Sequence, residues 1–148
     1  MHYPGNLKLI RLRPSSRLPS PATEGSAGYD LYADLDTPEV ILPGQTVTIP
    51  TGLSMQIAPG FAGFIFARSG LGVRHGIVPA NCVGVIDSDY RGEVLVALYN
   101  HAEQPFTVQP GDRMAQLVLL PVALPQIEEC RTLEESVRGS GGFGSTGR

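Results

Sequence analysis

Short apolar runs separated by turn-forming residues extend along the whole chain, and this pattern predicts strands rather than long helices. Alternation of apolar and polar residues is clearest at residues 46–50 and 53–57, where one face of each strand would be buried. Turn signals recur roughly every 8–12 residues, a spacing typical of an all-β barrel or sandwich. The predicted strands comprise residues 7–12, 40–42, 46–50, 53–57, 61–67, 82–86, 94–99, 106–108 and 114–122.

Two short helical segments are expected beside these strands. Residues 69–75 can form one short helix after the strand at residues 61–67. A helical turn is expected at residues 132–137, because Thr132 and Glu135 have the spacing of a capping box. The chain has 18 Gly and 13 Pro in 148 residues, so longer helices are not expected.

The stretch NCVGVIDSDYRGE at residues 81–93 combines a strand pattern with several reactive side chains. It begins as an apolar strand, turns through Asp, Ser and Gly, and is followed by the apolar run VLVALY. We therefore predict a β-hairpin. A purely structural hairpin needs no more than a turn pair such as Asp-Gly, whereas this turn also carries Asp87, Asp89, Tyr90 and Arg91. That group of side chains favours a functional hairpin.

The composition is that of a globular protein with one domain and excludes several classes of function. Hydrophobic residues make up 42% of the chain and charged residues 17%, which allows a sizeable core. The net charge of -3 gives no basic field that would attract nucleic acid. No apolar run approaches the ~20 residues of a membrane span, and the N-terminus lacks the pattern of a signal peptide. Cys82 and Cys130 make no disulfide framework, so two reduced thiols in a cytoplasmic protein are expected.

The Gly-rich C-terminal end imitates phosphate-binding motifs without their context. Gly139, Gly141 and Gly144 spell GxGxxG, but too few residues follow to form the helix that this motif requires. A P-loop is excluded because Ser145 stands where that motif has lysine. The three histidines lack partners at the spacing of zinc ligands.

The remaining polar groups together indicate a nucleotide site. Arginine, hydroxyl and amide donors suit phosphate oxygens, carboxylates suit a general base or Mg²⁺ with its waters, and aromatic faces suit a sugar or base. Taken singly, each has a structural explanation, such as a surface ion pair for Arg68. The groups are the donors Arg68, Ser69, Gln116, Arg138, Ser145 and Thr146, the carboxylates Asp30, Asp87 and Asp89, and the aromatic residues Tyr90 and Phe143.

Five motifs in order give the chain a resemblance to the homotrimeric dUTP diphosphatase (dUTPase) family over nearly its whole length. One departure is visible, since Ala67 precedes Arg68 where the family usually has proline. The motifs are AGYDLYA at residues 27–33, RSGLG at 68–72, NCVGVIDSDYRGE at 81–93, GDRMAQL at 111–117 and RGSGGFGSTG at 138–147.

This resemblance implies a jelly-roll-like distorted β-barrel at residues 1–137, a mobile C-terminal lid at residues 138–148, and three active sites at the interfaces of a homotrimer. It implies hydrolysis of dUTP to dUMP and pyrophosphate, which keeps uracil out of DNA and supplies dUMP for thymidylate synthesis. Asp87 would activate the water that attacks the α-phosphorus. Asp30 would act on Mg²⁺ indirectly, through water, and Tyr90 would pack under the deoxyribose.

The same resemblance assigns the remaining contacts. The backbone near Val85, Ile86 and Leu95 would read uracil together with the side chain of Asn81. The phosphates would be held by Arg68, Ser69, Gly70 and Gln116. The closing lid would bring Arg138, Phe143, Gly144, Ser145 and Thr146 to the substrate, with Phe143 stacked on the base.

Two alternatives stay open at this point. One is a dCTP deaminase or a bifunctional enzyme of the same superfamily, which needs other polar groups around the base. The other is a nucleotide-sensing interaction protein on this fold, in which catalysis is secondary.

Overall fold

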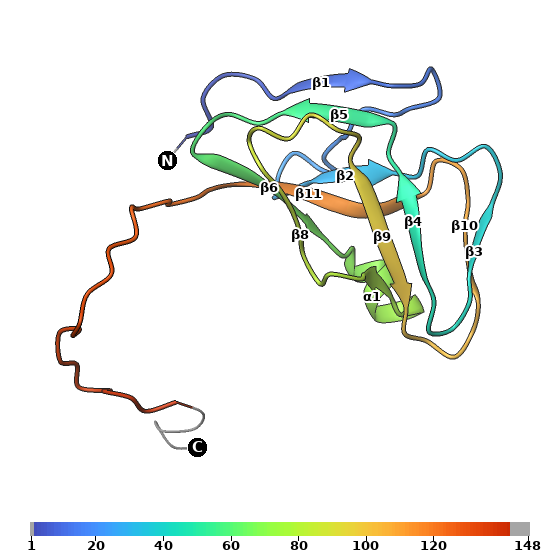
Figure 1. The fold of residues 1–148 in the computed structure, drawn as a ribbon. Helices are drawn as coiled ribbons and strands as arrows, with labels where there is room; N and C mark the ends of the chain where they lie inside the picture. Colours follow the sequence, from blue (N-terminus) through green and yellow to red (C-terminus); the bar gives the residue numbers. More distant parts are fainter. Residues whose placement is uncertain (1, 143–148) are drawn as a thin grey trace.

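The computed structural model describes residues 2–142, and this part of the chain forms eleven strands and one short helix (Figure 1). Helix α1 (Ser69–His75) ends at Gly76, whose φ of 67° lies in the left-handed region that glycine tolerates best. No helix of the described part is long and apolar enough to cross a membrane. The strands are β1 (Lys8–Arg11), β2 (Tyr29–Tyr32), β3 (Glu39–Ile41), β4 (Thr46–Pro50), β5 (Leu53–Gln56), β6 (Phe61–Phe66), β7 (Ile77–Pro79), β8 (Gly84–Ile86), β9 (Leu95–Asn100), β10 (Phe106–Val108) and β11 (Arg113–Pro121).

Four antiparallel sheets surround one interior. Their strand orders are β2-β11-β6-β8, β4-β9-β7, β1-β5 and β10-β3, so strands far apart in the sequence lie side by side. In the four-stranded sheet, β11 is central and pairs with both β2 and β6. The all-β class predicted from the hydrophobic pattern is confirmed. The predicted ranges 46–50, 69–75 and 106–108 coincide with β4, α1 and β10.

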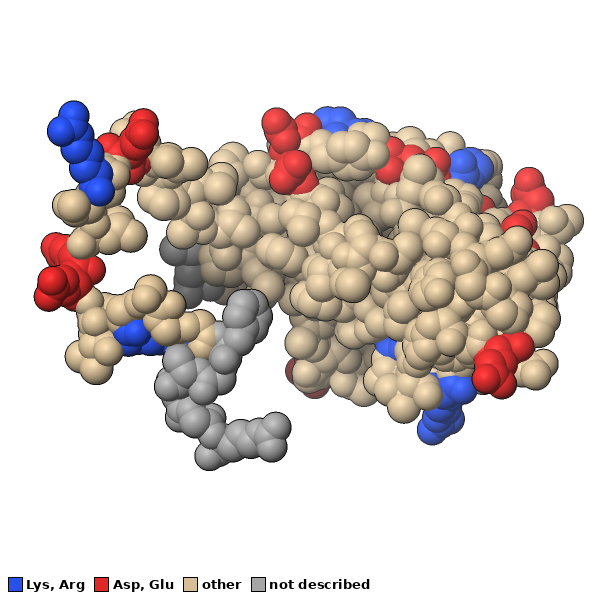
Figure 2. Space-filling model, turned by 60° about the horizontal axis from the view of Figure 1, so that its bottom comes forward, with Lys and Arg blue, Asp and Glu red and all other residues tan. Residues whose placement is uncertain are grey.

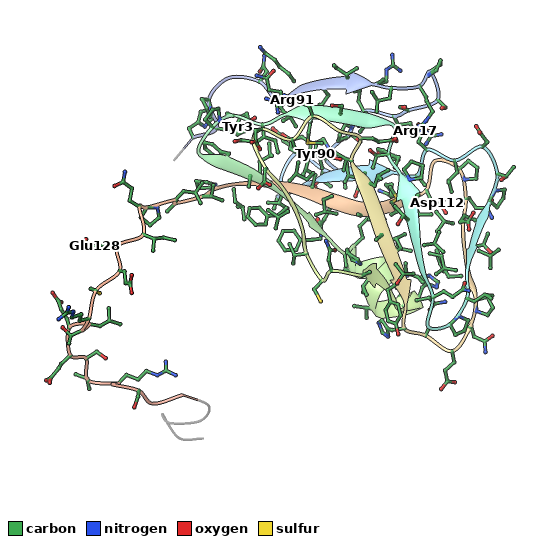
Figure 3. The ribbon with its side chains drawn as sticks, in the orientation of Figure 1. Tyr3, Arg17, Tyr90, Arg91, Asp112 and Glu128 are labelled. Atoms are coloured by element: carbon green, nitrogen blue, oxygen red, sulfur yellow. The ribbon has the colours of Figure 1, made fainter. Side chains whose placement is uncertain are left out.

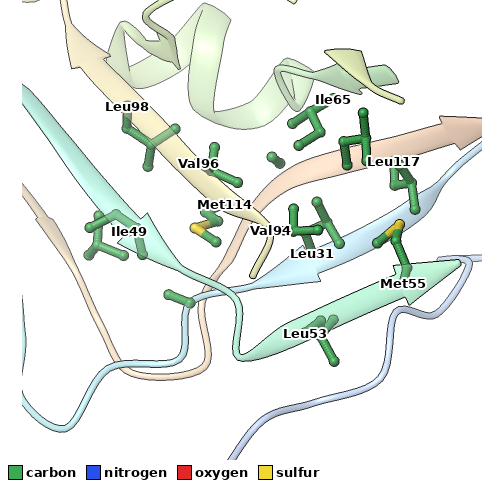
Figure 4. Close-up of a cluster of buried hydrophobic side chains, with 14 of the residues drawn as sticks. Leu31, Ile49, Leu53, Met55, Ile65, Val94, Val96, Leu98, Met114 and Leu117 are labelled. Carbon is green, nitrogen blue, oxygen red and sulfur yellow. The ribbon is translucent and has the colours of Figure 1, made fainter. Parts of the chain in front are cut away.

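The core is built from inward-facing residues of these sheets (Figure 4). In β9 the buried positions alternate, with Val96, Leu98 and Asn100 facing inward. Leu98 and Leu117 are fully buried, and burial of each such side chain contributes about 1.5–3 kcal/mol. The buried side-chain amide of Asn100 is satisfied, since its Nδ2 donates to the carbonyl oxygens of Ile41 at 2.9 Å and Gln104 at 2.8 Å.

The prediction of a β-hairpin around residues 81–99 is wrong. Strand β8 pairs with β6, whereas β9 pairs with β4 and β7, so the two predicted arms belong to different sheets. Residues 91–94, which follow the turn, bind to β5 instead of β8. Val94 N donates to Leu53 O at 2.8 Å, and Ser54 Oγ donates to Arg91 O at 2.7 Å. The first arm is also shorter than predicted, since Cys82 has a φ of 63° and lies in a turn before β8.

Two further local predictions need correction. Residues 132–137 form no helical turn; instead a hydrogen-bonded turn lies at residues 137–140, where Gly139 N donates to Ser136 O at 3.0 Å. A helix this short is marginal without packing, and these residues are exposed. Strands β2 and β7 are absent from the predicted ranges, and β7 has only three residues, of which the last is proline.

The chain leaves the packed body after β11 and continues as an extended segment (Figure 1). Large apolar side chains on this segment have no cover, and Ile127 is 99% exposed. The others are Leu124, Leu133 and Val137.

Candidate active site

Two pockets on the body are lined by most of the predicted site residues that the structure describes. The first, which we call the turn pocket, has a volume of about 220 Å³. The second, which we call the arginine pocket, has a volume of about 210 Å³. The turn pocket is lined by Ile65, Asn81, Gly84, Val85, Ile86, Asp87, Tyr90, Glu93, Val94 and Leu95. The arginine pocket is lined by Ala22, Ser26, Ala27, Gly28, Asp30, Arg68, Ser69, Gly70 and Gln116.

One wall of the turn pocket is the free edge of a sheet. Strand β8 is the last strand in the order β2-β11-β6-β8, so one edge of its backbone has no strand partner within residues 2–142. Such an edge presents N–H and C=O groups in alternation. Gly84 allows β8 to lie close to β6, because a Cβ there would be 3.2 Å from Ile65 Cβ. The pocket can therefore bind a flat polar ring by main-chain hydrogen bonds.

Tyr90 is one of the residues that line the turn pocket. Its hydroxyl donates to the carbonyl oxygen of Glu93 at 2.9 Å, and its amide donates to Asp87 O at 3.2 Å. These bonds fold the ring back across its own turn. Gly92 makes the fold possible, since a Cβ at this position would be 2.6 Å from Tyr90 Cζ.

The carboxylate of Asp87 lies directly after β8 and is exposed at the pocket. Among the described residues it takes part in none of the ion pairs. An exposed carboxylate at the end of a fixed strand is available to accept a proton from water.

The arginine pocket is organised by a buried carboxylate. Asp30 is 6% exposed, and its Oδ1 accepts from Arg68 Nε at 2.8 Å while its Oδ2 accepts from Arg113 Nη1 at 3.3 Å. Arg68 Nη1 also donates to Arg113 O at 3.2 Å. These contacts fix the plane of the Arg68 guanidinium, which keeps further N–H donors for an anion. Arg113 was not among the predicted site residues.

The other members of the arginine pocket follow from strand register. Gln116 on β11 pairs with Asp30 on β2 and with Phe66 on β6, which brings both neighbouring strands to its sides. Gln116 Nε2 donates to Ala67 O at 2.9 Å, so the residue that replaces the usual proline is held through its carbonyl. Gly28 lies so close to β11 that a Cβ would be 3.0 Å from Leu117 O.

Arg138, the C-terminal residue of the predicted site that the structure describes, lines neither pocket. Arg138 lies in the turn at residues 137–140, and its Nε donates to Gly141 O at 3.0 Å. Figure 3 shows Glu128, upstream on the same segment, far from Tyr90 on the body. Phe143, Gly144, Ser145 and Thr146 lie outside the described residues.

An ionic network behind the turn pocket was also missed. Glu93, which lines the pocket, accepts through Oε1 from Arg13 Nη2 and from Gly52 N at 2.8 Å. Arg13 Nε donates in addition to Asp34 Oδ2 at 2.7 Å. Burial raises the pKa of Asp34, but hydrogen bonds from Ser15, Arg13 and Ser16 outweigh it and hold that pKa below its ordinary value. The same hydrogen bonds to Glu93 and Asp34 raise the pKa of Arg13.

Comparison with known proteins decides the family. A sequence profile of the dUTPase family matches residues 15–147. The chain belongs to the dUTPase family. A family relative from Alcanivorax borkumensis is 51% identical over 139 residues, which is 93% of each chain. One from Pseudomonas aeruginosa strain LESB58 is 54% identical over 93% of this chain and 91% of its own. Both are named deoxyuridine 5'-triphosphate nucleotidohydrolase.

Solved structures of the dUTPase family share the fold. The dUTPase of Staphylococcus bacteriophage 80alpha with dUPNHPP has a TM-score of 0.89 and 25% identity, covering 97% of this chain and 99% of its own. The predicted dUTPase-like, jelly-roll-like architecture is confirmed by this likeness.

Proposed function

We propose that this chain is a dUTP diphosphatase, which hydrolyses dUTP to dUMP and pyrophosphate by attack of water on the α-phosphorus. The observation that carries the proposal is the position of Asp87, an open carboxylate directly after the edge strand that lines the turn pocket. The names of relatives about half identical over nearly the whole chain support the same reaction. The enzyme would keep uracil out of DNA and supply dUMP for thymidylate synthesis.

Uracil binds at the free edge of β8. The ring offers one N–H donor between two carbonyl acceptors, which matches alternating backbone groups near Val85 and Ile86. The start of β9 at Leu95 and the amide of Asn81 complete this edge. Cytosine presents a different donor and acceptor order, and unpaired buried polar groups can give ~10⁴–10⁵ discrimination.

Tyr90 packs under the deoxyribose, and its fixed ring leaves no room for a 2'-hydroxyl. The bonds from Tyr90 to Asp87 and Glu93 support this role, because they hold the ring before substrate arrives. Asp87 accepts a proton from the attacking water, which bonds to the α-phosphorus as the bond to the bridging oxygen of the leaving pyrophosphate breaks. Catalysis of this type depends on positioning and on electrostatic stabilisation.

Arg68, Ser69, Gly70 and Gln116 hold the phosphates in the arginine pocket. The pairing of Arg68 with buried Asp30 supports this role, since it fixes the guanidinium in one plane. Arg138 and the C-terminal residues close over the substrate and add donors to the γ-phosphate, with Phe143 on the base. The lid is assigned to residues 138–148 and the barrel to residues 1–137.

Mg²⁺ would be held mainly by the phosphates, with Asp30 acting through water. This arrangement fits the residues present, because residues 2–142 contain no cluster of three His, Cys, Asp or Glu side chains that would bind a metal directly. Both Asp30 oxygens already accept from arginines, which leaves their remaining lone pairs for a coordinated water. The ion would neutralise phosphate charge and fix the conformation of the chain of phosphates.

We further propose a homotrimer with active sites at subunit interfaces. The turn pocket and the arginine pocket share no lining residue within the described part, and β6 lies between them in the sheet order. Figure 2 shows a face of the body with few charged side chains, which suits contact with another subunit. The free thiols of Cys82 and Cys130 suit a cytoplasmic location, where they would stay reduced.

The test is a pyrophosphate-release assay with dUTP, dTTP, dCTP and UTP in the presence of Mg²⁺, with the mass in solution measured by light scattering. Selective cleavage of dUTP by a species of three chains is the expected result. Release of ammonia from dCTP would instead support the deaminase alternative. A protein that binds dUTP and a partner without cleaving the nucleotide would support the sensing alternative.

A further inference from the structure

A salt-bridged network connects the N-terminal loop to the turn that carries Asp87 and Tyr90. Arg13, in the loop that follows β1, donates to two carboxylates from different parts of the chain. One is Asp34, at the end of the β2 segment, and the other is Glu93, at the end of the turn. Of these three residues, only Glu93 lines the turn pocket.

Glu93 holds the turn through both its side chain and its main chain. Its carboxylate accepts from Arg13 and from the backbone of Gly52, which fixes the residue against the corner between β4 and β5. Its carbonyl oxygen accepts the hydroxyl of Tyr90 at 2.9 Å. Any movement of Glu93 therefore moves the partner that holds the Tyr90 ring in place.

Burial indicates which end of the network is fixed. The side chain of Asp34 is 3% exposed and is held by Ser16 Oγ at 2.8 Å as well as by Arg13. The side chain of Glu93 is 23% exposed and that of Arg13 is 41% exposed. Without the guanidinium, two carboxylates would face each other with no cation between them. Because Asp34 is the buried and anchored partner, Glu93 is the one that would move.

The loop at Gly52 leaves no alternative packing for this corner. Its φ is 67°, and a Cβ at this position would overlap both Asp34 Oδ2 and Ser16 Oγ. The amide of Gly52 can therefore approach Glu93 only with the backbone placed as it is. The corner itself is therefore rigid, so that on loss of Arg13 the Glu93 side chain, and not the corner, would shift.

We propose that Arg13 is a positioning residue of the active site, which acts through Glu93 to fix the Tyr90 ring and so sets the preference for deoxyribose over ribose. This inference rests on the proposed dUTP hydrolysis at the turn pocket. Arg13 lines neither the turn pocket nor the arginine pocket.

The test compares Arg13→Gln with Arg13→Lys and with the matched control Arg17→Gln. Arg17 lies in the same loop and loses the same charge, but its guanidinium contacts Gly111 O and the ring of Tyr32 rather than the turn. We expect Arg13→Gln to lower kcat/KM for dUTP about tenfold, as for loss of one charge-assisted hydrogen bond that supports a site. The kcat/KM for UTP should fall less, so that discrimination against UTP drops several-fold.

Product inhibition separates this role from a general loss of structure. The Ki of dUMP, which reports the turn pocket, should rise about fivefold in Arg13→Gln. The Ki of pyrophosphate, which reports the arginine pocket, should stay within about twofold. Arg13→Lys should restore part of the discrimination because it keeps a cation beside Glu93, and Arg17→Gln should behave as the wild type. If Arg13→Gln folds poorly, Glu93→Gln removes the same ion pair and should give the same pattern.

Unchanged discrimination against UTP in an active Arg13→Gln enzyme would overturn the inference. A parallel rise in both inhibition constants would also overturn it, since this indicates a structural role alone. A wild-type enzyme that does not cleave dUTP would refute the proposed function instead, and that outcome is visible before any variant is made.

Discussion

Replacement of Gly92 by alanine should displace the Tyr90 ring without unfolding the body. The added Cβ would be 2.6 Å from Tyr90 Cζ and closer still to its hydroxyl, whereas ordinary contact begins at about 3.4 Å. The end of the ring must therefore move by about 1 Å. This movement breaks or weakens its bond to Glu93 O, which is worth roughly 0.5–1.5 kcal/mol.

The loss should appear in catalysis more than in stability. A misplacement of about 1 Å at a site can lower the rate by ~10²-fold. We therefore expect kcat/KM for dUTP to fall by roughly 10- to 100-fold. Discrimination against UTP should weaken at the same time, because the ring no longer fills the space of the 2'-hydroxyl. The melting temperature should change by only a few degrees, about the effect of 1 kcal/mol.

Steady-state kinetics with dUTP and UTP, beside thermal melts, measure both effects. Gly25→Ala is the matched control, since a Cβ at Gly25 meets nothing within 4 Å. If Gly92→Ala kept kcat/KM for dUTP within twofold of the wild type and rejected UTP equally well, the claim that a fixed ring shapes this pocket would be refuted.

Four further changes test other parts of the structure. Asp87→Asn should bind an unreactive dUTP analogue with near-normal affinity but lose ~10²–10⁴-fold in kcat; near-normal turnover in a pyrophosphate assay would mean that another base acts. Truncation before Arg138 should leave the circular dichroism spectrum unchanged and lower kcat/KM by ~10³-fold or more, so a fully active truncated enzyme would contradict the lid. The lowered pKa of Asp34 means that its ionised form stabilises the fold fully above the ordinary carboxyl pKa of about 3.9, and that this contribution is lost as the pH falls through the lower folded-state pKa. The stability of Asp34→Asn should lack that part of the pH dependence in acid-unfolding measurements. Identical pH profiles for the variant and the wild type would show that ionised Asp34 does not stabilise the fold. Leu117→Ala should lower the free energy of unfolding by about 2–5 kcal/mol in urea titrations, and a loss under 1 kcal/mol would contradict its central place in the core.

Strands were predicted well where local pattern and local chemistry agree. Alternation at residues 46–50 gave β4, and the short segment at 69–75 gave α1 with Gly76 as its left-handed end. The hairpin prediction failed because the strand after the turn pairs with β4 and β7 instead of β8. Main-chain pairing between distant strands depends on the packing of the whole sheet, which no local pattern specifies.

The site divides in a similar way. Residue types within one motif, such as Asp87 and Tyr90, indicated nucleotide chemistry from the sequence, and the structure brings both to one pocket. Asp30 pairs with Arg113, which lies 83 positions away in the sequence. Arg13 pairs with Glu93, which lies 80 positions away. Surface and loop arginines have no pattern that would reveal such partners in advance.

The sequence by itself determined the chemical groups of this protein and their grouping in five motifs, because hydrogen-bonding and acid-base properties belong to residue types. It also determined the all-β class, because apolar periodicity and turn residues act over a few positions. The tertiary structure alone decided that β8 is an edge strand. This leaves the free backbone edge at which we propose that uracil binds. It also decided that a single guanidinium joins two carboxylates behind the turn, since such contacts exist only once distant segments pack together.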